Sequence, residues 1–150
     1  MKQIEIFTDG SCSQNPGPGG WGAVLRYGGH EKELSGGCGE TTNNRMELTA
    51  VIEALKCLKE PCSVTLTTDS QYIVNAVSKG WAKAWQAKNW RKGDGKPALN
   101  PDLWAELLDL LTKHNVSFNW VRGHNGHPEN ERCDSLAVEQ TNKFKSMDNA

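Results

Sequence analysis

The chain has 150 residues, of which 37% are hydrophobic and 23% are charged, and its formal net charge at pH 7 is -1. This length suits one domain with its own core, and neither a membrane-spanning apolar run nor a signal-peptide pattern is visible. The five cysteines are scattered without a Cys-x-x-Cys pair, which argues against a disulfide scaffold or a zinc site and for free thiols in a reducing cytoplasm.

The first predicted element is a largely apolar strand over residues 4–8, which is followed at once by Asp9 and Gly10. A strand in the middle of a sheet is apolar because both of its faces are covered. A carboxylate where such a strand leaves the core therefore needs a partner.

Residues 15–20 are rich in proline and glycine, which predicts a turn. Two further strands are predicted over 21–27 and 31–37, with a tight hairpin turn at 28–29 between them. Because the connections are short, the first three strands are expected to form an antiparallel meander.

A helix is predicted from Thr42 to about Lys59, because a polar start signal precedes apolar residues at helical spacing. Glu47 shares a face of this helix with Val51 and Leu55. Two explanations are open for a carboxylate on the buried side of a first turn. It stabilises the helix through the dipole or a salt bridge, or it belongs to a functional site.

The next strand, over 63–68, ends at Asp69, and a short helix over 70–78 follows it. A strand, a crossover helix and a strand form a right-handed unit, so this strand is expected to run parallel to the first. Asp9 and Asp69 would then share the sheet edge where open α/β sheets bind ligands. Either residue alone could cap a helix, but two adjacent carboxylates repel each other unless a cation lies between them.

The segment 79–96 carries six cations and one anion, and Trp81, Trp85 and Trp90 are interleaved with them. Its net charge of +5 leaves -6 for the remainder of the chain. Cations interleaved with aromatic side chains favour a polyanionic partner held at one place, and a solvated charged surface is the alternative. We call residues 79–99 the basic handle.

An Asn-Pro-Asp sequence at 100–102 is a helix start signal, with the asparagine as the expected cap. Trp104 falls on the apolar side of that helix and is expected in the core. A last strand over 116–120 alternates apolar and polar residues.

The segment 122–128 is a glycine-rich loop, and a final helix is predicted from about Glu129. Asp134 lies in the second turn of that helix. The residues after 143 are expected to be a frayed polar tail. No linker or repeat is visible, so 1–150 is expected to be a single catalytic domain.

Four acidic residues without matching basic residues cannot all stay ionised in one pocket unless cations neutralise them. Hard oxygen ligands select Mg2+ or Mn2+, and two such ions can activate a water and stabilise the leaving oxygen of a phosphodiester. Paired carboxylates also serve glycosidases, so another hydrolase remains open from the residues alone. The acidic residues are Asp9, Glu47, Asp69 and Asp134.

These acidic residues stand in four short motifs: TDGSC at 8–12, TNNRMEL at 42–48, TDSQY at 68–72 and GHNGHPENERCD at 123–134. In this order, and with the tryptophan-rich handle, the motifs resemble those of bacterial type 1 ribonuclease H over nearly the whole chain. The resemblance implies an α/β, ribonuclease H-like fold. Its mixed sheet has five strands in the order 3-2-1-4-5, an antiparallel meander of three plus two parallel strands, flanked by helices.

The resemblance also implies an endonuclease that hydrolyses the RNA strand of an RNA/DNA hybrid and leaves 5'-phosphate and 3'-hydroxyl ends. Such an enzyme is expected to be a cytoplasmic monomer with no membrane partner. One or two Mg2+ or Mn2+ ions would be held by the family's four carboxylates, which correspond to Asp9, Glu47, Asp69 and Asp134.

The family's loop histidine corresponds to His124, which is expected to shuttle a proton or assist product release. His127, beside Pro128, is expected to be structural. The residues that correspond to substrate contacts are Gly10, Cys12, Asn15, Thr42, Asn43, Asn44, Gln71, Trp81, Trp85 and Asn100. Asn15 and Asn43 also suit a turn and a cap, and Trp90 also suits packing of the handle onto the body.

Two departures from the family pattern stand out. Relatives often carry a basic residue two positions before Thr42, beside the pocket for a DNA phosphate, but this chain has Glu40. In the handle, this chain has Gln86 and Ala87 at positions where close relatives tend to carry basic residues. Because handle contacts are mainly electrostatic, hybrid affinity is expected to fall more steeply with salt than the cleavage chemistry.

Two rival functions belong to other classes. A non-catalytic module could bind hybrids with the handle alone. Four acidic residues at its binding site would, however, repel the polyanion and lower its affinity. A strand transferase of the same fold, as in integrases and transposases, would lack the handle and the His124 loop.

Overall fold

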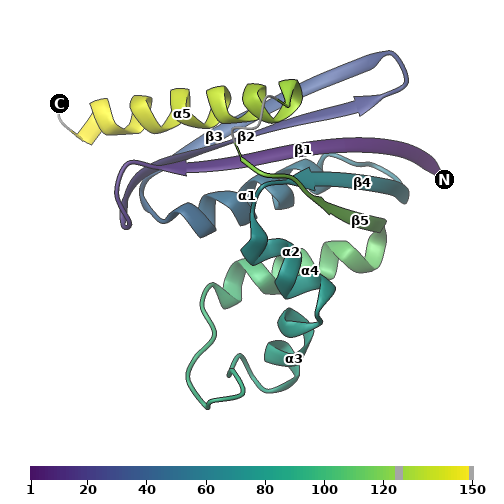
Figure 1. Cartoon of the computed structure of the whole chain (residues 1–150), viewed down its shortest axis with the longest axis vertical. Coiled ribbons are helices and arrows are strands. Elements are labelled where there is room, and N and C mark those ends of the chain that lie inside the picture. The colour runs from purple at the N-terminus through teal and green to yellow at the C-terminus, as the bar shows by residue number, and fades with distance from the viewer. Residues whose placement is uncertain (124–126, 149–150) are drawn as a thin grey trace.

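The computed structural model describes residues 1–123 and 127–148, which form a five-stranded sheet with helices on both faces (Figure 1). The strands are β1 (Lys2–Cys12), β2 (Gly17–Tyr27), β3 (His30–Thr41), β4 (Cys62–Thr68) and β5 (Asn115–Trp120). The helices are α1 (Asn43–Lys56), α2 (Gln71–Ser78), α3 (Trp81–Ala87), α4 (Pro101–Lys113) and α5 (Pro128–Asp148).

The strand order is β3-β2-β1-β4-β5, as expected. β2 pairs antiparallel with both β1 and β3, because two- and four-residue connections only allow the chain to reverse. β4 pairs parallel with β1, and β5 pairs parallel with β4, across the helical crossovers. The predicted mixed sheet, with a meander on one side and parallel strands on the other, is confirmed.

Alternation along the central strands divides the core between the two faces of the sheet. Ile4 and Ile6 of β1 pack on the face covered by α1 and α4, where Trp104 is completely buried as expected. Phe7 points the other way and packs with Val24 of β2 and Cys133 of α5. Figure 1 shows α5 along one side of the sheet and the other helices on the opposite side.

The meander strands are longer than the sequence predicted. β2 begins at Gly17, because Gly17 already pairs with Thr41 of β3, and Gly19 then pairs with Cys12 on one side and with Cys38 on the other. The proline- and glycine-rich segment therefore turns over residues 13–16 and then enters the sheet.

The C-terminal helix also exceeds the prediction. The segment expected to be a frayed polar tail from 143 is helical as far as Asp148, and this expectation was wrong. The reason is packing against β3, since a methyl group added at Gly37 would lie 2.6 Å from the Phe144 ring. Thr141, one turn earlier, is buried and donates to the Ala137 carbonyl at 2.9 Å.

The basic handle contains α3, which composition did not predict, followed by a loop in which Arg91 and Pro97 form an isolated bridge. α4 begins where the start signal placed it, but the expected cap is absent. Asn100 has a left-handed backbone with φ of 58°, and its side chain makes no capping hydrogen bond. That side chain instead forms hydrogen bonds with Arg45 and Tyr72.

Candidate active site

The parallel pairing of β1 with β4 brings two of the predicted carboxylates together. This ladder ends at the pair Phe7 and Thr67, so Asp9 and Asp69 both lie two residues beyond it. β1 does not end at Asp9 as expected, because it continues to Cys12 in pairing with β2. Asp9 is consequently held in a strand and is only 6% exposed.

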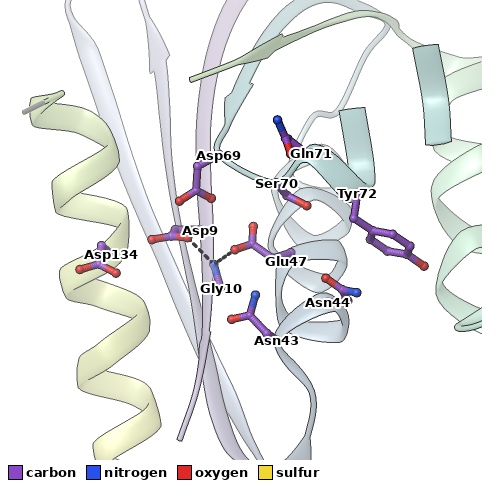
Figure 2. Close-up of a pocket in the computed structure, with 10 residues that line it drawn as sticks. All are labelled: Asp9, Gly10, Asn43, Asn44, Glu47, Asp69, Ser70, Gln71, Tyr72 and Asp134. Atoms are coloured by element: carbon purple, nitrogen blue, oxygen red, sulfur yellow. Dashed lines mark hydrogen bonds between the residues drawn. The ribbon is translucent and has the colours of Figure 1, made fainter. Parts of the chain in front are cut away.

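Glu47 joins this pair from the first turns of α1 and is 3% exposed. The backbone N–H of Gly10 donates to Asp9 Oδ1 at 2.9 Å and to Glu47 Oε1 at 3.0 Å (Figure 2). Gly10 allows this approach because a Cβ there would lie 2.5 Å from the Glu47 backbone nitrogen. A strand glycine that admits another backbone is a known use of the residue.

Three of the four predicted carboxylates form a tight cluster. Oxygen atoms of Asp9, Glu47 and Asp69 all lie within 4.8 Å of one another. Asp134 projects from α5 and lines the same pocket, as Figure 2 shows, but it is outside this cluster. The structure therefore gathers all four side chains around one pocket and places three of them at ligand-sharing distance.

The cluster is electrostatically unfavourable without a cation. Burial, and after it the charge of Asp69, raises the pKa of Asp9 to about 7. Burial also raises the pKa of Glu47 well above its usual range, followed by the charges of Asp9 and Asp69. Among the described residues, no basic side chain pairs with Asp9 or Glu47. A salt bridge of Glu47 is thus excluded within the described part of the chain.

The residues fit a hard divalent cation. All three clustered donors are carboxylates, and Glu47 Oε2 is buried without a hydrogen-bond partner. A buried carboxylate oxygen normally has a hydrogen-bond partner. An unpaired carboxylate oxygen in an acidic cluster is therefore typical of a side chain that binds a metal ion. Oxygen donors suit Mg2+ or Mn2+, and the described cysteines lie outside the cluster.

Several of the predicted substrate residues lie beside the carboxylates. Gly10, Asn43, Asn44 and Gln71 line the pocket, together with Ser70 and Tyr72 (Figure 2). Sequence reasoning did not single out the last two, although both stand in the TDSQY motif. Ser70 also caps α2, since its hydroxyl accepts from the Ile73 N–H at 3.2 Å.

Three other predicted contacts have structural partners and do not line the pocket. Asn15 Oδ1 accepts from the Asn43 N–H at 2.8 Å, which ties the turn to the start of α1. Thr42 caps α1 by accepting from the Arg45 N–H at 3.2 Å. The Cys12 thiol donates to the Gln14 carbonyl at 2.6 Å. Their polar atoms therefore serve the fold.

The tryptophans of the handle have different environments. Trp81 is 44% exposed, with the Lys79 ammonium 5.1 Å from its ring centre. Trp85 is half-buried and packs edge-on against Trp104 with ring centres 6.1 Å apart. Trp90 is half-buried against the core, which agrees with its packing role.

His124 lies outside the described residues. Its neighbour Gly123 is close to the carboxylates, since a Cβ there would lie 2.6 Å from Asp69 Oδ2. His127 has the structural setting that was expected. Its ring lies 5.7 Å from the Phe7 ring, and its Nδ1 is 3.5 Å from a carboxylate oxygen of Glu129.

The described helices include none that is long and apolar enough to cross a membrane.

The family model for RNase H matches residues 1–142. A ribonuclease H of Desulforamulus reducens is 64% identical over 138 residues, which cover 92% of this chain and 87% of that protein. A ribonuclease H of Rhizobium meliloti is 57% identical over 145 residues, which cover 97% and 94% of the two chains.

Solved structures agree with these sequence relatives. LC9-RNase H1, a type 1 RNase H with the type 2 active-site motif, is similar with a TM-score of 0.85 and 31% identity, covering 96% of this chain and 74% of that one. LC11-RNase H1 in complex with an RNA/DNA hybrid is similar with a TM-score of 0.72 and 27% identity, covering 93% and 97%.

Proposed function

This chain belongs to the ribonuclease H family, and we propose that it is an endoribonuclease that hydrolyses the RNA strand of RNA/DNA hybrids with the aid of divalent metal ions. The observation that carries this proposal is the cluster of Asp9, Glu47 and Asp69, whose oxygens lie within 4.8 Å of one another beside a polar pocket. The relative solved in complex with an RNA/DNA hybrid supports the substrate.

The cluster would hold one or two Mg2+ or Mn2+ ions, with Asp134 contributing from α5, where it lines the same pocket. When bound, such ions lower the pKa of an attacking water and stabilise the leaving oxygen of a phosphodiester. The protein's own part is to hold the Asp9 and Glu47 carboxylates in place through the backbone N–H of Gly10, which donates to both. Cleavage of this kind leaves 5'-phosphate and 3'-hydroxyl ends.

Small polar side chains beside the carboxylates would read the hybrid. Asn43, Asn44 and Gln71 line the pocket with donors and acceptors that suit minor-groove edges and 2'-hydroxyl groups. Exposed Trp81 and the cations of the handle would hold the backbone of the DNA strand. His124, the residue after Gly123 in the sequence, would carry a proton near neutral pH. We further propose that the enzyme acts as a cytoplasmic monomer.

A gel assay tests the function directly. Labelled RNA is incubated in a hybrid, in an RNA duplex and as a single strand, each with Mg2+, Mn2+ or a chelator. The proposal expects internal cleavage of the hybrid RNA only, dependent on metal, with product 3' ends that a polymerase can extend. Cleavage in the chelator, or equal cleavage of all three substrates, would contradict it.

A second experiment separates the enzyme from a binding module. Asp9→Asn should retain hybrid binding and lose most cleavage, because the amide keeps the shape of the site but supplies no negative charge for a cation. A module that binds with the handle alone would show no cleavage in either protein. A strand transferase would join DNA ends, which an assay with labelled DNA and Mn2+ detects.

A further inference from the structure

The end of β5 and the residues after it lie directly against Asp69. The Trp120 indole N–H donates to the backbone carbonyl of Asp69 at 3.0 Å. The Val121 N–H donates to a carbonyl of β4 at 3.0 Å, and a Cβ at Gly123 would lie 2.6 Å from Asp69 Oδ2. These contacts fix the segment beside one member of the carboxylate cluster. We call residues 120–123 the Asp69 wall.

Trp120 exposes a flat apolar surface on this wall. Val116 and Phe118 share its face of β5 and pack against the core, but Trp120 is 41% exposed. β5 is an edge strand of the described sheet, which leaves this side of the strand open. The only donor of the indole is already bound to Asp69, so the group that remains for a ligand is the ring itself.

The wall also carries a cation. Arg122 is exposed two residues after Trp120. Within the described part of the chain it takes part in no ion pair, so its charge is available to a partner. An exposed aromatic ring near a cation is typical of surfaces that bind nucleic-acid backbones, and the handle shows the same combination in Trp81 and Lys79.

The place of the wall selects one strand of the hybrid. The phosphate that is cleaved belongs to the RNA strand and has to reach the carboxylate cluster, which the wall touches through Asp69. The handle, which would hold the DNA strand, is on another side of the site. Figure 1 shows the chain after β5 running to α5, away from α3 of the handle. The wall therefore faces the RNA strand.

The chemistry of an intact duplex narrows the contact further. The faces of the bases are covered by stacking inside the duplex, so a flat side chain outside it meets the sugars. An RNA strand in an A-form helix displays its riboses along a wide and shallow minor groove. The ring of Trp120 is therefore suited to the apolar face of a ribose.

We propose that Trp120 packs on a ribose of the RNA strand close to the cleaved phosphate, while Arg122 binds an RNA phosphate beside it. The Asp69 wall then holds the RNA strand as the handle holds the DNA strand. This inference rests on the proposed function, since it assumes a hybrid at the carboxylates. Such a contact is made before and during cleavage alike, so it changes KM and leaves kcat nearly unchanged.

The main test compares Trp120→Ala with Trp120→Phe. Both variants lose the N–H that binds the Asp69 carbonyl, but only alanine loses the flat ring. KM for the hybrid should rise about tenfold in Trp120→Ala and stay within about threefold of the wild type in Trp120→Phe. A purely structural role of the hydrogen bond predicts equal changes in both variants, and that result would overturn the inference.

The matched control is Tyr27→Ala. Tyr27 is also a partly exposed aromatic residue at the end of a strand, with 45% exposure, but β2 ends there far from the carboxylates along the sheet. Both kinetic constants should equal those of the wild type. A rise in KM as large as that of Trp120→Ala would show a general effect of removing exposed rings and would overturn the inference.

Chemical substitution of the hybrid identifies the strand. Single 2'-O-methyl nucleotides are placed along the RNA strand or along the DNA strand, and affinity is measured by fluorescence anisotropy in a chelator. One RNA position should weaken wild-type binding about fivefold but leave Trp120→Ala unaffected, because the added methyl displaces the ring. If the variant differs from the wild type only at DNA positions, or at none, the inference is refuted.

The part assigned to Arg122 has its own measurement. Arg122→Gln should reduce the slope of log affinity against log salt by about 1, because one phosphate contact is lost. An unchanged slope would overturn this part of the inference.

Folding and function are separated by two further comparisons. If Trp120→Ala does not fold, Trp120→Leu takes its place with the same expected result, because leucine keeps an apolar cover on the strand end without a flat ring. A wild type that leaves hybrids intact would refute the proposed function. A wild type that cleaves hybrids, with equal KM in the alanine and phenylalanine variants, would refute only the role of Trp120.

Discussion

Replacing Asp9 by asparagine should stabilise the metal-free protein while it abolishes cleavage. Asp9 is buried, and its pKa is raised from the ordinary 3.8 to about 7, first by burial and then by the charge of Asp69. The folded protein therefore keeps a proton on Asp9 in a pH range where the unfolded chain has already released it. Ionising this group works against the fold, and an amide removes that penalty.

The size of the effect follows from the pKa difference. Each pKa unit corresponds to about 1.4 kcal/mol, so a rise from 3.8 to about 7 amounts to about 4 kcal/mol above pH 7. Water reaches the pocket and the side chains can relax, so we expect about half of this, or about 2 kcal/mol. For a domain of 150 residues this is a rise in Tm of about 4–8 °C.

The raised pKa also determines how the stability of the wild type changes with pH. Because the folded pKa is raised, the free energy of unfolding of the wild type should fall as pH rises from about 4 to 7. Asp9→Asn lacks this loss, so its advantage should be largest at pH 8, about half as large at pH 5.5, and absent near pH 4.

Urea denaturation in a chelator at pH 8 and 5.5 measures both proteins. Asp109→Asn is the matched control, because this carboxylate on α4 has a side chain that is 68% exposed, and the same change there should alter stability by less than about 0.5 kcal/mol. An Asp9→Asn protein that is no more stable than the wild type at pH 8, or whose advantage does not shrink at pH 5.5, would refute the electrostatic reasoning.

Three further outcomes are expected. Excess Mg2+ should raise the Tm of the wild type more at pH 8 than at pH 5.5, because protons compete for the carboxylates, and it should barely change Asp9→Asn; differential scanning fluorimetry detects this. Lys83→Ala in the handle should reduce the slope of log affinity against log salt by about 1, measured by fluorescence anisotropy with a labelled hybrid, and an unchanged slope would remove Lys83 from the interface. Gly22→Ala should destabilise the fold by about 1–3 kcal/mol in urea, because its Cβ would lie 2.6 Å from the Cys133 carbonyl, whereas Gly93→Ala, with nothing within 4 Å, should not.

The sequence predicted most of what depends on neighbours along the chain. Apolar alternation and short turns identified the strands, and a polar start before apolar residues identified α1. Glu47 was noticed because it stands on a face that its helix buries, and Asp69 because it ends a buried strand. The charge and tryptophans of the handle were visible in the same way. These signals come from residues that are near each other in the sequence, so they can be recognised without knowledge of the fold.

Local signals misjudged the ends of elements where distant partners decide. β2 extends through glycines because β1 and β3 lie on both sides of it, and α5 continues past 143 because Phe144 packs over Gly37. Asp9 looked like the end of a strand, but β2 keeps that strand in the sheet for three more residues. Propensity is a weak prior when tertiary pairing supplies hydrogen bonds.

The geometry of the site was decided by tertiary structure alone. The sequence identified four acidic residues, but only packing brought oxygens of Asp9, Glu47 and Asp69 within 4.8 Å of one another and left Asp134 lining the pocket outside that cluster. The hydrogen bonds that Arg45, Tyr72 and Trp104 form around Asn100 join three helices, and no sequence motif predicts them. The physical reason is range: a side chain's type is written in the sequence, while the distances and hydrogen-bond directions that tune its chemistry depend on strand register and helix packing.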